Sequence, residues 1–310
     1  MNFKDIKLEF FHFRKAFLQY HQGWQYIYNK FILAKKIYRL NRVFGEEITH
    51  QNLSIHTMLG HKHVVMGLWS LCSFYIAANF SGKLYIHSDG TLTNNDQKIL
   101  SKFFPQSELV DPGQVLSKYA AEYDQYPPIK KFRLEHKDNF FQTKLIDPYI
   151  ISTKDIRLFF DVDILWFKNP DLIQNEIENG CPHSLMMSQL FKSSDNPSDA
   201  NTVYFKDGSK LPEKYSTYNG GIMLYSKNNF PAAKLINYLE NLDMSRLESQ
   251  HWVEQSGYAY NMQHLEYLPM ENYPIKELVT DRVVARHYTG PRRAEFYIEG
   301  IPRIIKKLGI

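Results

Sequence analysis

The acids Asp161 and Asp163 carry the clearest chemistry in this 310-residue sequence. They lie in the stretch 155–170, whose apolar run predicts a buried central strand. In a strand, side chains at positions i and i+2 share a face, so the two carboxylates would point the same way. Such a pair repels unless a cation lies between the acids, and hard divalent cations prefer oxygen ligands. The pair therefore predicts a metal site, against the plainer alternative of one surface acid and one turn-capping acid.

Two glycines, Gly220 and Gly221, directly precede a predicted strand that ends at Tyr225. Glycine lets the backbone approach a ligand closely, although a tight turn would need glycine as well. We therefore expect this segment to border a ligand.

A histidine, His287, ends another short predicted strand, and the turn at Gly290 and two adjacent arginines, Arg292 and Arg293, follow it. A lone histidine is more often structural than a ligand. Imidazole is nevertheless a common metal ligand, and guanidinium groups bind anions in bidentate fashion. The segment thus offers a metal ligand and anion clamps close together.

Strands and helices alternate from Leu53 onward. Strands are predicted at 55–59, 83–87, 108–110 and 184–188, and helices at 63–80, 96–104, 140–150 and 169–179. This order and these lengths imply parallel pairing with right-handed crossovers, and a nucleotide-type α/β fold with its site at the carboxyl ends of the strands. Residues 111–140 are interpreted as an insertion or flexible segment, and 192–214 as a long surface loop of the kind that often forms a lid.

Composition indicates a globular protein, with 15% aromatic and 23% charged residues. Cys72 and Cys181 are too few for a disulfide framework and are not clustered as zinc ligands would be, so a reducing cytosol fits them best. Charged residues stand where a secretory signal would need an apolar core, and a cytoplasmic location is expected. The run 64–80 is uncharged, but its length is marginal for a membrane span and it is interpreted as a buried crossover helix.

The first 45 residues hold nine basic and two acidic residues, although the whole chain carries only +4. The remaining body is thus slightly negative, which argues against a nucleic-acid surface. Aromatic and aliphatic residues recur every three or four positions from Phe3 to Tyr38, which predicts one helical stripe that Gly23 divides. The stripe is expected to pack against the body, or else residues 3–38 contact a membrane.

Three blocks together resemble a known family: Phe160–Leu165, Tyr218–Leu224 and His287–Arg292. In order and spacing they are similar to the signature blocks of nucleotide-sugar glycosyltransferases of the GT-A fold. The closest resemblance is to glycosyltransferase family 8, which includes glycogenin and bacterial lipooligosaccharide galactosyltransferases. Glu254-Gln255 and Leu268-Pro269 look like that family's acidic-Gln and Leu-Pro elements. The resemblance covers roughly residues 53–295, and the combination is specific where each block alone is weak.

The resemblance implies a GT-A domain over residues 49–310, with a mostly parallel sheet flanked by helices, preceded by a basic amphipathic helical extension over 1–48. It also implies transfer of a hexose, with retention, from a nucleotide-diphosphate sugar such as a UDP-sugar to a glycan or lipid-linked acceptor. Where the family has acidic residues after its first strand, this chain has Leu59-Gly60-His61-Lys62, so the identity of the base stays open.

The resemblance implies roles for individual residues as well. Mn²⁺ or Mg²⁺ would be bound by Asp161, Asp163 and His287, and the two acids together with Glu254 and Gln255 form the catalytic set. Donor-binding positions would be Gly60, Lys144, Asn219, Gly220, Gly221, Gly290, Arg292 and Arg293.

Two other classes of function remain open. The segment His87-Ser-Asp89-Gly-Thr-Leu superficially resembles the Asp-x-Asp-Gly-Thr block of haloacid-dehalogenase phosphatases, but a histidine stands at the nucleophilic position and cannot form an aspartyl-phosphate. A non-catalytic nucleotide-sugar or glycan-binding protein on the same fold is the second alternative. Release of nucleotide from a nucleotide sugar would separate these readings from a transferase.

Overall fold

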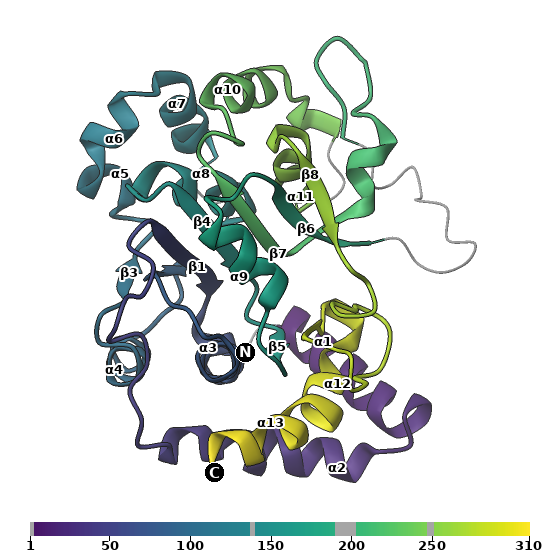
Figure 1. Cartoon of the computed structure of the whole chain (residues 1–310). Helices are drawn as coiled ribbons and strands as arrows, with labels where there is room; N and C mark the ends of the chain where they lie inside the picture. The colour runs from purple at the N-terminus through teal and green to yellow at the C-terminus, as the bar shows by residue number, and fades with distance from the viewer. Residues whose placement is uncertain (1–2, 137–139, 190–202, 247–250) are drawn as a thin grey trace.

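The computed structural model describes residues 3–136, 140–189, 203–246 and 251–310. Its centre is a seven-stranded sheet of order β3-β2-β1-β4-β7-β6-β8 (Figure 1). The strands are β1 Leu53–Leu59, β2 Lys83–Ser88, β3 Glu108–Val110, β4 Ile156–Phe160, β6 Ser184–Ser188, β7 Tyr218–Ser226 and β8 Leu265–Leu268. Neighbouring strands are parallel except that β7 runs antiparallel to both β4 and β6. The predicted mostly parallel α/β architecture is confirmed.

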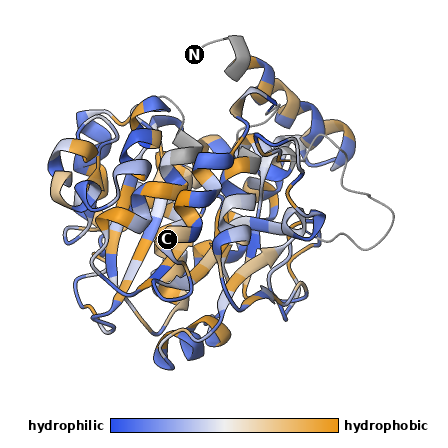
Figure 2. Ribbon diagram, turned by 90° about the horizontal axis from the view of Figure 1, so that it is seen from above, coloured by the Kyte–Doolittle hydropathy of each residue, from blue (hydrophilic) through white to orange (hydrophobic). Residues whose placement is uncertain are grey.

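Two apolar layers cover the two faces of the sheet, and the alternation of side chains along β7 divides them. Ile222 and Leu224 join the layer on one face, while Met223 and Tyr225 join the layer on the other. The first layer contains α3 Val64–Ala77 and α4 Asn94–Phe103, and the second contains α8 Phe140–Ile151, α10 Ala232–Asn241 and α11 His251–Asn261. In Figure 2 the strands under these layers are mostly hydrophobic. Burial on both faces explains the nearly continuous apolar runs of these strands.

Within the uncharged run 64–80, only the 14 residues of α3, Val64–Ala77, are helical, and most of them are buried. Among the residues that the structure describes, none of the helices is both long and apolar enough to cross a membrane.

The segment 111–140 is helical where the sequence suggested an insertion or flexible segment. Its helices are α5 Val115–Lys118, α6 Ala120–Asp124 and α7 Pro127–Glu135. A buried ion pair between Arg133 Nε and Asp147 Oδ1, 3.0 Å long, fixes α7 to α8, and the Tyr123 hydroxyl donates to the same oxygen over 2.6 Å. Residues 137–139 of that segment, and residues 192–202 of the predicted surface loop, lie outside the described residues.

The predicted central strand is shorter than expected. Strand β4 ends at Phe160, residues 161–163 form a turn, and β5 Ile164–Trp166 leaves the main sheet to pair antiparallel with β9 Ala285–His287. The sequence predicted that Asp161 and Asp163 lie in one strand and share a face of it, but both acids follow the end of β4. The turn serves the same purpose, because it brings both acids to the end of β4 and joins them to the strand that ends at His287.

The N-terminal extension consists of α1 Phe3–Arg14, the π-helical turn η1 Lys15–Gln19, α2 Gly23–Tyr28, the π-helical turn η2 Asn29–Leu33 and the 3₁₀-helix η3 Ala34–Arg39. We call residues 3–40 the arm. The predicted break near Gly23 is confirmed, but the single continuous stripe is wrong, because π and 3₁₀ turns shift the helical phase. In Figure 1 helix α1 lies beside α12, whereas α2 and the segment after it run beneath α13.

The remaining elements connect these layers. They are α9 Asp171–Glu178, α12 Arg293–Glu295, α13 Ile301–Leu308, the π-helical turn η9 Phe296–Gly300 and the short 3₁₀-helices η4 His61–His63, η6 Glu213–Thr217, η7 Met244–Arg246 and η8 Gly290–Arg292.

Candidate functional site

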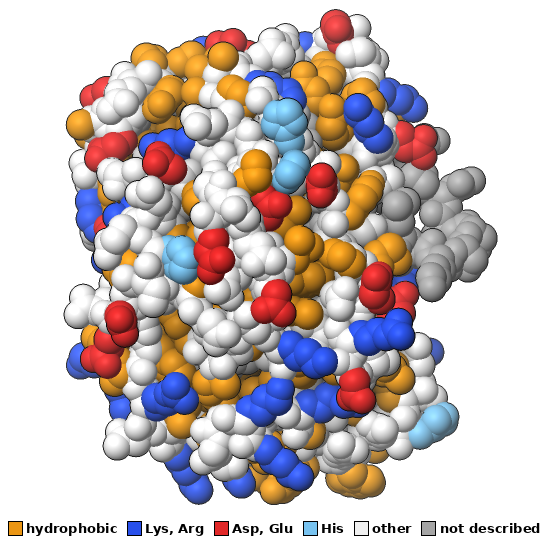
Figure 3. Space-filling view, viewed as in Figure 1, with side chains coloured by type: hydrophobic (Ala, Val, Ile, Leu, Met, Phe, Trp, Pro, Cys, Tyr) orange, Lys and Arg blue, Asp and Glu red, His pale blue; other side chains and the backbone are white. Residues whose placement is uncertain are grey.

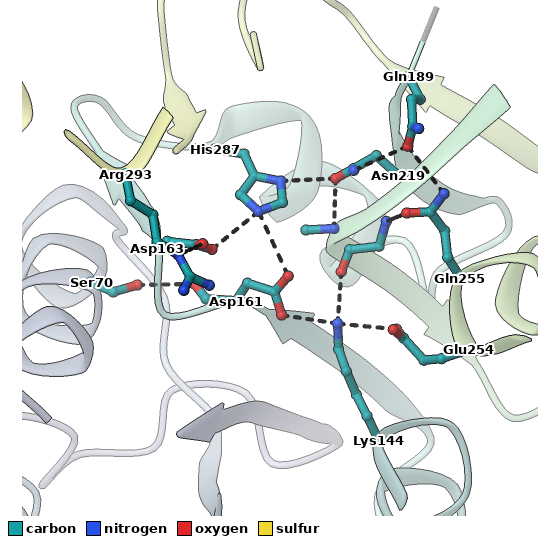
Figure 4. A network of polar contacts seen from close by, with 12 residues as sticks. Ser70, Lys144, Asp161, Asp163, Gln189, Asn219, Glu254, Gln255, His287 and Arg293 are labelled. Carbon is teal, nitrogen blue, oxygen red and sulfur yellow. Dashed lines mark hydrogen bonds and ion pairs between the residues drawn. The ribbon is translucent and has the colours of Figure 1, made fainter. Parts of the chain in front are cut away.

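Asp161, Asp163 and His287 converge at the carboxyl end of β4 (Figure 4). The His287 Nε2 atom lies 3.1 Å from Asp163 Oδ1 and 3.7 Å from Asp161 Oδ2. Backbone hydrogen bonds fix these positions, since Asp161 N donates to Gly221 O over 2.9 Å and Tyr288 N donates to Asp163 O over 2.8 Å. The trio can supply two carboxylate oxygens and one imidazole nitrogen to a single cation, because one possible ligand atom of each residue lies within 4.8 Å of the other two.

The orientation of the imidazole suits metal binding. His287 Nδ1 lies 2.9 Å from Asn219 Oδ1, and that oxygen also accepts from Gly221 N over 2.9 Å. Because an amide oxygen only accepts, the Nδ1 atom must carry the proton, and a neutral His287 then presents the lone pair of Nε2 to the two acids. Gly221 is required here, since a Cβ at that position would collide with the His287 ring. The glycine therefore makes room for a side chain of the site rather than only for a ligand.

The two arginines after Gly290 have different surroundings. Arg293 Nε lies 3.1 Å from Asp163 Oδ2, and its Nη1 lies 3.5 Å from His63 Nε2. Arg292 Nη1 instead contacts Glu295 Oε1 at 3.3 Å and Lys276 O at 3.2 Å. Burial opposes the charge on Asp163, but the contacts with His287 and with the Arg293 guanidinium outweigh burial and hold the pKa of that carboxyl well below its usual range.

Lys144 joins Asp161 to Glu254. Its Nζ lies 2.9 Å from Asp161 Oδ1 and 3.0 Å from Glu254 Oε1, and it donates to Gly220 O over 3.2 Å. Burial alone would lower the pKa of the Lys144 amine, but the negative charges of Asp161 and Glu254 outweigh burial and raise that pKa above its usual value. Lys144 therefore stays protonated. Burial raises the pKa of Glu254 to about 7, with Lys144 offsetting part of this and Asp161 adding to it. The Glu254 carboxyl can therefore gain or lose a proton near neutral pH.

Three amide side chains line the wall beside Glu254. Gln255 Oε1 accepts from Gly220 N over 3.2 Å, and Gln255 Nε2 donates to Gln189 Oε1 over 3.1 Å. Asn219 Nδ2 also points to Gln189 Oε1, at 3.4 Å. This wall offers hydrogen-bond donors and acceptors of the kind that bind hydroxyl groups.

These residues surround a cavity of about 540 Å³. All the predicted site residues line it except Gly60 and Arg292. A Cβ at Gly60 would collide with the carboxylate of Asp89, which fills the space beside the end of β1. Residues predicted from separate blocks of the sequence therefore lie around one cavity.

Sequence reasoning missed three polar residues that line the cavity, Gln189, His63 and Thr289. Gln189 directly follows β6, and His63 lies in the turn between β1 and α3. Their positions after strands that end at the same edge of the sheet could have signalled both.

No protein-family profile matches this chain, and no curated protein sequence matches it significantly. Solved structures do. The WbbM bifunctional glycosyltransferase aligns over 86% of this chain and 51% of its own, with 12% identity and a TM-score of 0.51, so this chain spans about half the length of that protein. Mouse xyloside xylosyltransferase 1 aligns over 76% of this chain and 96% of its own, with 12% identity and a TM-score of 0.47. The galactosyltransferase LgtC, in complex with donor and acceptor sugar analogs, aligns over 83% of this chain and 95% of its own, with 12% identity and a TM-score of 0.49.

At 12% identity the likeness to WbbM establishes the fold alone. The seven-stranded mixed sheet, with its site at the carboxyl ends of the parallel strands, is thus a GT-A-type fold.

Proposed function

We propose that this chain is a metal-dependent glycosyltransferase that transfers a hexose from a nucleotide-diphosphate sugar, with UDP-sugars as the first candidates. One observation carries the proposal: Asp161, Asp163 and a correctly oriented His287 share a cavity with Arg293. This combination supports binding of a divalent cation together with a diphosphate. The family 8 resemblance of the sequence points the same way.

The donor set fits Mn²⁺ or Mg²⁺. Carboxylate oxygens suit both ions, and an imidazole nitrogen favours Mn²⁺ over Mg²⁺. Asp163 can serve two partners at once, because Oδ1 faces His287 while Oδ2 faces Arg293. A cation bound there would neutralise charge on the diphosphate of the donor.

Arg293 has the role of stabilising the leaving group. When the bond between the anomeric carbon and the diphosphate oxygen breaks, negative charge develops on the departing nucleotide. The Arg293 guanidinium stands beside Asp163 at the cavity wall, where it can donate hydrogen bonds to phosphate oxygens. Arg292 pairs with Glu295 and has no comparable route to the donor.

Lys144, Glu254 and the amide wall would hold the hexose. Lys144 fixes the carboxylates of Asp161 and Glu254 on either side of its amine, so the two acids cannot move apart. Gln255 and Asn219 offer hydrogen bonds to sugar hydroxyls. For the retaining outcome, the acceptor oxygen bonds to the anomeric carbon on the side from which the diphosphate leaves, and the hydroxyl proton passes to the departing phosphate oxygen.

The phosphatase reading loses its support. His87, at the position where that family has its nucleophile, is 1% exposed and lies 3.0 Å from the ring of His56 inside the sheet. The non-catalytic binding protein remains the alternative that an activity measurement must separate from a transferase.

We further propose that residues 1–48 are an accessory extension of a catalytic domain formed by residues 49–310. In this proposal the acceptor is a glycan or a lipid-linked glycan, and residues 3–38 bring the chain to the inner face of a membrane. The basic charge of the extension supports this, since anionic head groups attract Lys and Arg.

Incubation with Mn²⁺ and a panel of UDP-, GDP- and ADP-sugars tests the proposal, with released nucleotide as the measurement. Wild type should release nucleotide from at least one donor, and Asp163→Ala should lose at least about 100-fold of this activity, since it removes charge stabilisation of the transition state. Asp281→Ala, which changes an exposed acid, is the matched control.

Nucleotide binding without release by any donor would favour the non-catalytic alternative. An Asp163→Ala variant with wild-type turnover in EDTA would show that the metal site is assigned to the wrong residues.

A further inference from the structure

Exposed apolar side chains are concentrated on the arm. Within the described residues, 16 large hydrophobic side chains are exposed, and 11 of them belong to residues 6–38. Trp24 is 78% exposed, and Phe10 and Leu18 are each 66% exposed. Contiguous apolar surface of this kind marks an interaction site. We call these side chains the outer face of the arm: Ile6, Leu8, Phe10, Phe11, Phe13, Leu18, Trp24, Tyr28, Phe31, Ile32 and Tyr38.

The outer face is continuous across the bend between α1 and α2. The centroid of the Phe17 ring lies 4.5 Å from the centroid of the Phe13 ring on one side and 5.8 Å from that of the Trp24 ring on the other. Beyond the bend, Trp24 and Tyr28 lie four residues apart near the two ends of α2 and share one side of it. Phe31, in the π-helical turn that follows, is also exposed. The aromatic residues thus form one surface over two helical segments.

A different face of the arm packs on the body. Ala16, Tyr26, Ala34 and Ile37 are buried in the layer formed with α3 and α13. Side-chain hydrogen bonds reinforce this contact, because Trp69 Nε1 donates to Ala34 O over 2.9 Å and Asn29 Nδ2 donates to Tyr297 O over 2.8 Å. The body therefore already occupies the inner face, and the outer face is available for another partner.

The charges around the outer face are almost all positive. Residues 6–45 contain eight basic residues and one acid, Glu9, which pairs with Lys30. Helix α13 contacts η2 and adds the exposed side chains of Arg303, Lys306 and Lys307. Lys and Arg side chains gather over the lower helices in Figure 3, and in Figure 2 hydrophobic and hydrophilic residues mix along α1 at the edge of the molecule.

We infer that the outer face binds the surface of an anionic lipid bilayer. Trp, Tyr and Phe favour the boundary between head groups and acyl chains, while Lys and Arg bind the phosphates of anionic lipids. A protein partner would not require that the charges around the outer face be nearly all positive, whereas an anionic surface does. The arm would thus lie in the plane of the membrane.

The arm also contacts the helix that carries Arg293, one of the residues that line the cavity. Helix α1 packs against α12, whose first residue is Arg293. If the proposed transferase function holds, on which this step alone rests, the arm presents the cavity to an acceptor whose lipid part lies in the membrane.

Co-sedimentation with vesicles tests the inference. The full-length wild type should pellet with phosphatidylcholine–phosphatidylglycerol vesicles at low salt and much less with pure phosphatidylcholine. The variant Phe10→Ser/Trp24→Ser/Phe31→Ser should bind anionic vesicles at least about tenfold more weakly, since apolar burial and charge both contribute to interfacial binding. Its control is Leu134→Ser/Leu172→Ser/Leu278→Ser, which changes exposed apolar residues elsewhere.

The fluorescence of Trp24 gives a second measurement on the unmutated fold. The chain has four tryptophans, and of the described side chains Trp69 and Trp166 are buried whereas Trp24 is exposed. The part of a blue shift and of quenching by brominated lipid that disappears in Trp24→Phe therefore reports on Trp24. Equal pelleting of wild type and the outer-face variant, or equal binding to neutral and anionic vesicles, would overturn the inference. So would a lipid-free dimer that the outer-face variant dissociates, because a second copy would then cover the face. None of these outcomes depends on nucleotide release.

Discussion

Arg292 and Arg293 are identical in charge and adjacent in sequence, yet their partners differ. Arg293 contacts Asp163 at the wall of the cavity, whereas Arg292 contacts Glu295 and does not line the cavity. The sequence could only predict that one or both arginines bind the diphosphate, because spacing does not distinguish neighbours at a turn. The direction of each side chain depends on the helix that begins at Arg293.

The Arg293→Ala variant should weaken binding of UDP with Mn²⁺ by about 2–5 kcal/mol, the usual cost of removing one partner of a buried charge-assisted contact. Arg292→Ala is the matched control and should leave nucleotide binding within about twofold, because Arg292 pairs with Glu295 and is not among the residues that line the cavity. Isothermal titration calorimetry measures both. Unchanged binding in Arg293→Ala, or an equal loss in both variants, would contradict the assignment.

Most of the residues that line the cavity could be named from the sequence because their types and order resemble those of a known family. His287 lies more than a hundred residues after Asp163, and no local pattern brings the two together. Gln189 was missed for a physical reason: a single glutamine after a strand has no distinctive local signal, and its role follows from its contacts with Gln255 and Asn219. Those contacts depend on the pairing of β6 with β7.

At the scale of elements, the predicted bounds were correct where the local sequence pattern determines where a strand ends. They were wrong where pairing with a distant strand determines it. The bounds of β3 and β6 were predicted correctly. The end of β4 was not, because the run 155–170 is apolar on both sides of the turn at 161–163. Only the pairing of β5 with β9 shows that the chain changes sheets there.

A buried polar chain crosses from β1 to β2 outside the donor site. His56 Nδ1 lies 3.0 Å from His87 Nε2, and His56 Nε2 lies 2.9 Å from Ser54 Oγ. The His56 ring also stacks on Tyr85 with centroids 4.9 Å apart. Burial lowers the pKa of His87 to about 3, and burial together with the neighbouring His87 lowers that of His56. Both rings are therefore neutral in the folded protein.

This pair predicts loss of stability in acid. The unfolded histidines bind protons below about pH 6.5 while the folded ones do not, so falling pH favours the unfolded state. The free energy of unfolding should decrease below pH 6.5, by up to about 1.4 kcal/mol per pH unit for each histidine, down toward the pKa of the folded groups. Urea denaturation at pH 7.5, 6.5 and 5.5 in EDTA measures this slope.

The His87→Gln variant is the control for the acid effect, and it should show a smaller slope because one titrating group is gone. Part of the slope should remain, since burial also lowers the pKa of His12, to about 4. Glu254, whose pKa is raised to about 7, binds a proton in the folded state over the same pH range and opposes this slope, so the decisive comparison is between the two proteins. Equal slopes in wild type and His87→Gln would show that the buried pair does not titrate as described.

At the scale of the whole molecule, the arm has two faces with different roles. Its inner face belongs to the same apolar layer as α3 and α13. It also reaches the segment that carries the site, because the Tyr20 hydroxyl donates to Glu295 Oε1 over 2.5 Å, and Glu295 contacts both Arg286 and Arg292. Arg286 directly precedes His287 on β9. The arm is thus connected through Glu295 to both strand β9 and helix α12.

A chain that begins at Gly45 should therefore be less stable and should bind UDP with Mn²⁺ more weakly than the full chain. Removal of the buried side chains Tyr26 and Ile37 alone costs about 1.5–3 kcal/mol each in lost apolar burial, and loss of Tyr20 releases Glu295 beside α12. Thermal unfolding and calorimetric titration measure the two effects. The outer-face variant Phe10→Ser/Trp24→Ser/Phe31→Ser is the control and should keep the melting temperature of wild type, because its changed side chains are exposed. If the shortened chain melts at the wild-type temperature and binds UDP equally well, residues 1–44 contribute neither to the stability of the body nor to the donor site.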